Sequence, residues 1–320
     1  MVPEPWAPMT KIGPVEFGTR LMVRARIAAE MPSSPLHAPV LEWYAARARD
    51  LPWRAPGTSP WAVLVSEVML QQTPVARVEP VFRDWLARWP TPAALAVEPV
   101  GEAVRAWGRL GYPRRALRLH QAASAMVERH GGEVPSTYDG LRCLPGVGDY
   151  TASAVLAFAY GQRQAVLDTN VRRVLSRVLG GQQYPPAGLS SAERRRAEDL
   201  LPDNPALAAR WAVGLMELGA LVCTARAPSC AACPITEGCA WRADGYRPYD
   251  GPPRRGQAYE GTDRQARGRI LAVLRGATEP VPQPVVAAAA SSDAAQAERT
   301  LASLVTDGLV VPDPAGFRLP

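Results

Sequence analysis

Apolar residues recur at spacings of three and four through most of the chain, a pattern typical of helices that bury one face. Threonine or proline marks many expected helix starts. The pattern predicts helices at 39–49, 60–72, 75–88, 92–96, 100–107, 114–130, 136–143, 150–160, 169–179, 192–201 and 205–221. The chain up to that point is therefore expected to be helical.

The chain after residue 242 shows a different pattern. A stretch rich in proline, glycine and arginine, 243–261, is expected to be a linker. Helices are expected at 263–274, 284–290 and 293–306, followed by strands at 309–311 and 317–319. Three helices and a hairpin are typical of a winged-helix domain. The third helix would enter a DNA groove, but its one basic residue is Arg299, so packing or partner contact is an equal expectation.

Composition limits the function classes. The 320 residues suggest two or three domains, and a formal net charge of +6 favours an anionic partner. Lys11 is the one lysine beside 35 arginines, so Lys11 alone could form a Schiff base. No run of about 18 apolar residues predicts a membrane span, and residues 1–37 are expected to be a disordered extension without a signal core. We therefore expect a cytoplasmic protein that does not contact membranes.

Leu144-Pro145-Gly146-Val147-Gly148-Asp149-Tyr150-Thr151-Ala152 joins two expected helices. Gly146 and Gly148 allow a tight turn around Val147, and the following helix start offers free backbone N–H groups. A helix, a Gly-x-Gly turn and a second helix can hold a nucleic-acid phosphate without reading a base. A monovalent cation on the turn carbonyls is also expected. The alternative is an ordinary helix–helix turn.

Acidic residues interrupt two apolar helices. The apolar positions of 60–72 that should face a core are Trp61, Leu64, Val65, Val68 and Met69. Glu67 lies among them, and burial there would raise the pKa of its carboxyl; the alternative is a solvated face. Glu217 interrupts the apolar helix at 205–221 beside Trp211. Asp168 stands where a helix N-cap belongs, which could also hold a carboxylate at a cleft.

The segment 110–115 places Tyr112 beside Arg114 and Arg115. An aromatic among arginines is common where a protein grips a nucleic-acid backbone and wedges beside a base. The alternative is a solvated basic turn.

Four of five cysteines lie within 17 residues, as Cys223, Cys230, Cys233 and Cys239. Structural zinc sites usually pair two short knuckles, whereas this spacing has one C-x2-C pair and two wide loops. The spacing favours a [4Fe-4S] cluster, with zinc as the alternative. Cys143 stands apart and is expected to be a small buried apolar residue.

Together, these motifs resemble the A/G-specific adenine DNA glycosylases of the helix-hairpin-helix superfamily. The resemblance rests on Ser66–Thr73, Leu144–Ala152, Val166–Val171 and the cysteine loop, and it covers about 38–242. It implies base-excision repair of adenine mispaired with 8-oxoguanine or guanine in double-stranded DNA, by base flipping, in a nucleoid-associated monomer.

The resemblance assigns roles residue by residue. Glu67 matches the general acid that protonates adenine at N7, and Asp168 matches the carboxylate that stabilises the sugar cation. Asn170 and Tyr150 match the sugar side. The positions that match the adenine pocket are Arg49, Trp53, Leu70 and Glu217. Those that match contacts around the orphan base are Gln72, Thr73 and Tyr112.

Bifunctional relatives such as endonuclease III carry a lysine where this chain has Tyr150, so the resemblance implies a monofunctional enzyme. The alternatives are an endonuclease III-like glycosylase for oxidised pyrimidines and a non-catalytic iron–sulfur DNA-binding protein.

The implied fold is all-α and bilobal, with a six-helix barrel lobe at 58–167 and a cluster lobe from 38–57 plus 168–242. The cluster would brace a loop that brings Arg226 and Arg242 near phosphates. The tail at 262–320 is too short for the 8-oxo-dGTP-hydrolase-like domain of many members. Three alternatives follow for the orphan base: it is read by Gln72, Thr73 and Tyr112, it is read by the tail, or discrimination between 8-oxoguanine and guanine is weak.

Overall fold

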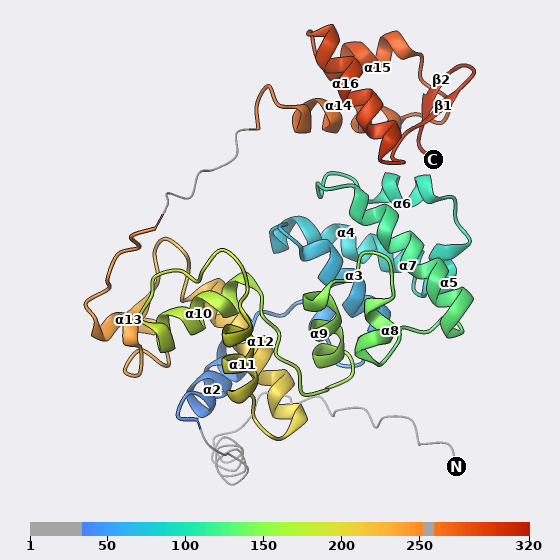
Figure 1. Cartoon of the computed structure of the whole chain (residues 1–320). Helices are drawn as coiled ribbons and strands as arrows, with labels where there is room; N and C mark the ends of the chain where they lie inside the picture. The colour runs from blue at the N-terminus through green and yellow to red at the C-terminus, as the bar shows by residue number, and fades with distance from the viewer. Residues whose placement is uncertain (1–33, 252–258) are drawn as a thin grey trace, which may run out of the picture. The chain divides into compact units, whose positions relative to one another are not determined.

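The computed structural model describes residues 34–251 and 259–320 (Figure 1). The expected N-terminal extension therefore lies almost wholly outside the described residues, as does the middle of the expected linker. The prediction of a helical fold is confirmed, since the described chain has one two-stranded sheet and is otherwise built from helices and connecting turns. In the described part of the chain, no helix is both long and apolar enough to cross a bilayer.

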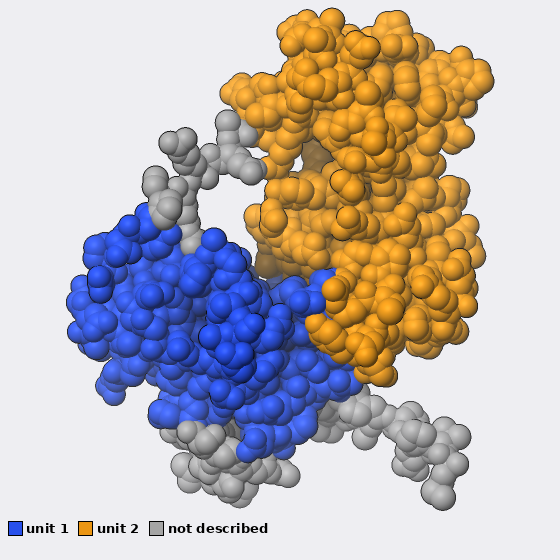
Figure 2. Space-filling view, in the orientation of Figure 1, with its two compact units in different colours: residues 1–63, 148–252 blue, residues 64–147, 253–320 orange. Residues whose placement is uncertain are grey.

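The chain separates into two compact units, 1–63 with 148–252 and 64–147 with 253–320 (Figure 2). The helix α3 (Pro60–Leu70) contains one of the boundaries between them. The other elements of the first unit are α2 (His37–Arg47), η1 (Pro52–Arg54), α9 (Asp149–Phe158), α10 (Thr169–Gly180), α11 (Ser191–Asp199), α12 (Pro205–Leu221), η2 (Cys230–Ala232) and α13 (Ala240–Ala243).

The core of the first unit forms around α12. Asn204 caps this helix by accepting from the Leu207 N–H, and Pro205 occupies the first helical position. The buried face of α12 packs against α2, α9 and α10, with Trp211 in edge contact with the ring of His37 at 4.7 Å between centroids. α12 therefore sets the positions of the helices around it.

The second unit contains α4 (Val75–Arg88), α5 (Pro92–Ala96), α6 (Val100–Ala106), α7 (Arg114–His130) and α8 (Tyr138–Arg142). Helix α7 packs against α5 and α6. Trp85 is buried with Trp89 and Trp107, in edge contacts at 4.6 and 5.7 Å between ring centroids. These large aromatic side chains fill the interior of the barrel-forming helices.

The same unit includes the C-terminal domain, with α14 (Asp263–Gly276), α15 (Gln283–Ala290), α16 (Ala294–Thr306), β1 (Val311–Asp313) and β2 (Gly316–Arg318). The strands are antiparallel, with Val311 opposite Arg318, and Val281 bridges to Phe317. The first strand starts two residues later than expected because Leu309 and Val310 are buried rather than paired in the ladder.

Contacts within the unit join this domain to the barrel helices. Arg275 Nε donates to the Val104 carbonyl at 3.0 Å, and Arg105 donates to the Arg275 carbonyl. Arg114 and Asp307 form an ion pair at 3.4 Å. A side chain at Gly101 on α6 would meet the Pro320 carbonyl oxygen, so the end of the chain lies directly against that helix.

Candidate functional site

Glu67 is a buried carboxylate on the apolar helix α3. Ser59 accepts a hydrogen bond from the Ala62 N–H at the start of this helix, and Pro60 follows it. All the apolar positions predicted to face a core are buried, and Glu67 itself is 6% exposed. The alternative of a solvated face is wrong, because packing of the whole helix takes the Glu67 side chain away from water.

Arg115 braces the turn that ends α3. Its guanidinium is buried and donates to the carbonyls of Met69 and Gln71 at 3.1 and 2.6 Å. It also donates to the Thr73 hydroxyl at 3.1 Å and to the Gly111 carbonyl at 3.0 Å. Burial lowers the pKa of Arg115 to about 10, which leaves it charged at neutral pH. One buried cation therefore holds two loops of the unit together.

Gln72 and Tyr112 lie on those two loops. They have φ values of 55° and 49°, in the left-handed region that residues with a side chain rarely adopt. Both are exposed, Tyr112 at 40%. Thr73, by contrast, is buried, and its hydroxyl donates to the Leu110 carbonyl at 3.2 Å. Of the three predicted orphan-base contacts, Gln72 and Tyr112 therefore lie at the surface, whereas Thr73 is buried and accepts a hydrogen bond from Arg115.

Asp168 caps α10, as expected. Its Oδ1 accepts from the Val171 N–H at 2.6 Å, and its Oδ2 accepts from the Asn170 amide at 2.7 Å. The side-chain Oδ1 of Asn170 in turn accepts from Arg173 Nη2 at 2.9 Å, which fixes the amide orientation. Burial raises the pKa of the Asp168 carboxyl, although both hydrogen bonds favour the charged form. The carboxylate is thus held in one orientation.

A glycine lets α12 approach this group. A Cβ at Gly219 would lie 2.7 Å from the Asn170 Cβ and 2.9 Å from its carbonyl oxygen. Only hydrogen fits at this crossing, so the first turn of α10 depends on Gly219.

Glu217 is a second buried carboxylate, with no exposed side-chain surface. Arg49 donates to it through Nε and Nη2, both at 2.7 Å, and Arg54 forms an ion pair with it at 3.0 Å. Burial acts to raise the pKa of Glu217, but the hydrogen bonds and charges of the two arginines outweigh it and leave that pKa below its usual value. Trp53, from the same 3-10 turn as Arg54, is buried.

The Gly-x-Gly turn matches expectation at one glycine. Gly146 has φ +80°, and a Cβ there would lie 2.8 Å from the Arg118 Cβ. Gly148 instead has an extended backbone and is the N-cap of α9. Because glycine has no side chain, no N-cap side chain accepts from the N–H groups in the first turn of α9. The Val147 carbonyl accepts from the Arg142 guanidinium at 2.5 Å, so a cation from the protein itself already lies on one of these carbonyls.

Tyr150 lies in the first turn of α9, half-buried. It packs beside a small apolar cluster that includes Ala154, Val166 and Ala212. No lysine lies in the described residues, since Lys11 precedes them.

The four cysteines line one small cavity of the first unit, together with Arg177 and Trp241. Among the described residues, no three His, Cys, Asp or Glu side chains are arranged to hold a single metal ion. The buried Arg177 guanidinium donates to the Cys223 sulfur at 3.3 Å and to the Thr224 carbonyl at 2.8 Å. Four cysteine sulfurs on one cavity beside a fixed positive charge suit an anionic cluster larger than one ion. Arg226 and Arg242 of this loop region are exposed.

One sequence expectation needs correction, and one that was left open gains an observation. Cys143 is exposed rather than buried, because it follows the short helix α8 while Leu141 and Leu144 take the inward positions. Arg299 on α16 is engaged with Asp263 at 2.9 Å, and the arginines of the C-terminal domain that line a cavity lie on α14 instead. Helix periodicity does not show which helix of a small domain faces its neighbour.

Three of the arginines that hold these groups were not predicted, namely Arg54, Arg173 and Arg177. The fourth, Arg115, was expected on a basic turn that grips nucleic acid, and the structure buries it instead. In a chain with 35 arginines, no local signal distinguishes a buried arginine from a solvated one. Of the predicted residues, the structure brings together Arg49 with Glu217, Asp168 with Asn170, and the four cysteines.

Two solved structures of known proteins have a similar fold. The fold is similar to that of a thermostable thymine-DNA glycosylase, with a TM-score of 0.58 and 26% identity over 71% of this chain and 99% of the other. It is also similar to endonuclease III in a non-covalent complex with DNA, with a TM-score of 0.55 and 22% identity over 71% and 99% of the two chains. The fold is therefore endonuclease III-like.

Residues 65–197 match the family described as HhH-GPD superfamily base excision DNA repair protein. The chain is 54% identical to an adenine DNA glycosylase of Mycobacterium tuberculosis, over 88% of this chain and 92% of the relative. It is 49% identical to an adenine DNA glycosylase of Mycolicibacterium smegmatis over 85% and 91%, and 38% identical to a thymine/uracil-DNA glycosylase of Pyrobaculum aerophilum over 61% and 86%. The chain belongs to the HhH-GPD superfamily.

Proposed function

We propose that this chain is a monofunctional adenine DNA glycosylase that excises adenine mispaired with 8-oxoguanine or guanine. The 54% identity to an adenine DNA glycosylase over most of both chains supports the substrate. The observation that carries the chemistry is Glu67, a carboxylate 6% exposed on an apolar helix. A carboxyl held away from bulk water is suited to the general-acid step of this reaction.

Cleavage of the N-glycosidic bond leaves positive charge on the sugar and negative charge on the departing base. In the proposed mechanism, the flipped adenine accepts a proton from Glu67 at N7, so it departs as a neutral base. Asp168 lies beside the sugar and stabilises the cation, with Asn170 holding its carboxylate oxygen in place. Glu67 then helps to deprotonate the attacking water.

Tyr150 limits the reaction to base removal. A phenol on the first turn of α9 cannot form a Schiff base, and the chain has no lysine after Lys11. We therefore infer that the product is an intact strand with an abasic site.

Arg49, Trp53 and Leu70 are assigned to the adenine pocket, where Arg49 and Arg54 hold Glu217 ionised. An ionised, hydrogen-bonded carboxylate is suited to orienting polar base edges rather than to donating a proton. This separates its task from that of Glu67.

The backbone N–H groups at Gly146, Val147 and Gly148 are proposed to bind a phosphate of double-stranded DNA. Arg142 lies on the Val147 carbonyl, which supports a charge-neutralising role there beside any monovalent cation. The enzyme would act as a monomer on the nucleoid in the cytoplasm.

The four cysteines are proposed to hold a [4Fe-4S] cluster, which the family generally carries. When bound, the cluster would stabilise the cysteine loop rather than take part in the chemistry, with Arg177 balancing its negative charge. Exposed Arg226 and Arg242 would then approach phosphates, so loss of the cluster should weaken DNA binding more than the chemical step. Absorbance near 400 nm and iron content test this assignment, and zinc alone would contradict it.

The proposal is tested by single-turnover reactions on a labelled duplex with adenine opposite 8-oxoguanine, beside a thymine-glycol duplex. We expect breaks on the adenine strand only after hot alkali, and no product from thymine glycol. Breaks on thymine glycol without alkali, with adenine untouched, would replace the proposal with an endonuclease III-like function.

A further inference from the structure

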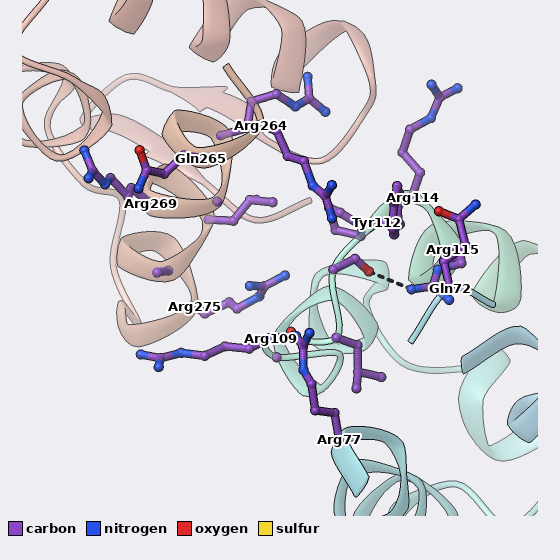
Figure 3. Close-up of a pocket in the computed structure, with 18 of the residues that line it drawn as sticks. Gln72, Arg77, Arg109, Tyr112, Arg114, Arg115, Arg264, Gln265, Arg269 and Arg275 are labelled. Carbon is purple, nitrogen blue, oxygen red and sulfur yellow. Dashed lines mark hydrogen bonds between the residues drawn. The ribbon is translucent and has the colours of Figure 1, made fainter. Parts of the chain in front are cut away.

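A wide cavity in the second unit lies between the 108–118 segment and α14, with a volume of about 1180 Å³ (Figure 3). None of its lining residues is acidic, and nine are arginines. They are Arg77, Arg109, Arg114, Arg115, Arg118, Arg264, Arg267, Arg269 and Arg275. An open space lined this way attracts an extended anion.

Several of these charges are already engaged. Arg114 and Arg267 share Asp307, at 3.4 and 2.5 Å, and Arg275 bonds the Val104 carbonyl. Arg115 is buried and donates to the carbonyls of Met69, Gln71 and Gly111. The remaining positive charge is therefore carried by the exposed arginines.

Five exposed arginines of the cavity have no carboxylate within ion-pair distance among the described residues. They are Arg77, Arg109, Arg118, Arg264 and Arg269. Arg77 comes from α4, Arg109 from the turn after α6 and Arg118 from α7, whereas the other two come from α14, so both walls of the cavity carry uncompensated charge. The walls belong to one compact unit.

Tyr112 connects the two walls. Its ring lies between two guanidiniums, with Arg115 at 5.4 Å and Arg264 at 4.8 Å from its centroid. Arg264 comes from the C-terminal domain, so a residue of α14 contacts the exposed aromatic of the other wall (Figure 3). Such cation–π contacts restrain an otherwise strained side chain.

We propose that α14 forms the second wall of a DNA-binding groove, with Arg264 and Arg269 binding backbone phosphates of the strand beside Tyr112. This rests on the proposed function. At about 1.5 Å and 100° per residue, the two arginines lie about 7.5 Å apart along α14 and about 140° apart around it, so each would reach a different phosphate. Arg264 also positions the Tyr112 ring. The contact is to phosphate and independent of sequence.

The proposal assigns the DNA contact to the first helix of the C-terminal domain rather than to its third. Arg299 on α16 is exposed, is paired with Asp263 and does not line the cavity. It is therefore a matched control, an arginine of the same domain outside the groove.

The test compares full-length R264A/R269A with R299A. Binding is measured to a duplex carrying tetrahydrofuran, an uncleavable abasic analogue, opposite 8-oxoguanine, over a series of KCl concentrations. We expect about tenfold weaker binding by the double variant and a salt slope smaller by about two, since each phosphate contact contributes about 0.9 to that slope. R299A should match the wild type, and R264K/R269K should recover most of the affinity.

Equal affinity and salt slope in the double variant and the wild type would overturn the proposal, as would an equal loss in R299A. Thermal melting confirms that each variant is folded. Adenine excision by the wild type is measured in parallel. If adenine is not excised but the double variant still loses affinity, the proposed function fails while the groove stands.

A second readout tests positioning. With 2-aminopurine placed next to the orphan base, insertion of Tyr112 should raise the fluorescence at saturating protein. We expect R264A to reduce this rise and R269A to leave it unchanged. An unchanged signal in R264A would contradict a positioning role.

Discussion

Glu67 and Glu217 are both buried glutamates on largely apolar helices, one in each compact unit. Glu217 receives two guanidiniums, and its pKa lies below the usual value. Glu67 lies on α3 among Leu64, Val68 and other fully buried apolar side chains. Burial alone therefore does not define a role, because two glutamates of similarly low exposure lie in different surroundings.

This difference assigns opposite tasks to similar side chains. A glutamate held ionised by arginines can orient and bind but is a poor acid. A glutamate buried on an apolar helix is suited to giving a proton to a leaving base. The following variants test that division.

The largest effect is expected from E67Q. The amide keeps the size of the side chain but cannot donate its proton to adenine, so excision should fall by about 10²–10⁴. Binding to the mismatch should survive. Single-turnover rates and equilibrium binding measure both. Glu79→Gln, at an exposed ion pair on α4, is the control and should react like the wild type. Retained excision by E67Q would assign the acid elsewhere.

D168N should have the next largest effect. Asparagine caps a helix about as well as aspartate, so α10 should keep its start. Loss of the negative charge beside the sugar should slow excision about 10²–10³-fold. Single-turnover rates at saturating enzyme measure this, and an unchanged rate in a folded variant would remove Asp168 from the mechanism.

E217Q should affect stability more than the chemical step. It leaves Arg49 and Arg54 without their carboxylate, at a cost of about 2 kcal/mol, below the roughly 3–5 for a fully buried pair because Arg49 is 34% exposed. Urea unfolding measures the difference. A loss as large in excision rate as that of E67Q would contradict the separation of tasks.

The smallest expected effect is a change with pH in the free energy of unfolding that separates the wild type from E217Q and D168N. The folded pKa of Glu217 is lowered, so its contribution is present above its unfolded pKa and is lost as pH falls through the folded value. The folded pKa of Asp168 is raised, so its contribution has the opposite sign and is lost as pH rises through that value. The stability gap between wild type and E217Q should therefore shrink from pH 7 to pH 3, whereas D168N should not show that trend. Urea titrations across this range measure the gap, and a gap that stays constant would contradict the pairing.

Helix boundaries were predicted well where local chemistry sets them. The predicted bounds at 75–88, 92–96, 114–130 and 205–221 agree with the structure. Proline at or just before the start marks all four, and glycine or a Pro-containing turn follows the end of the first three, signals that act over a few residues. The strands of the C-terminal hairpin were misplaced, since burial of Leu309 and Val310 is a tertiary effect.

The carboxylates of the candidate site were found because a charge in an apolar helix is visible in the sequence. Their arginine partners were not, because the contact of Arg54 with Glu217 joins residues far apart in the chain. The left-handed backbone at Gln72 and Tyr112 was equally invisible, since neither residue type indicates it. Sequence pattern thus singles out candidate groups, and packing decides how they are held.

We propose that the protein removes adenine by protonating it at N7 from the buried Glu67 carboxyl on α3. This proposal is tested most directly with a duplex that carries 7-deazaadenine, which lacks N7, opposite 8-oxoguanine. Because the base lacks N7, we expect the wild-type protein to bind this duplex about as tightly as the adenine duplex but not to excise the base. Excision of 7-deazaadenine at a rate close to that of adenine would contradict the proposal.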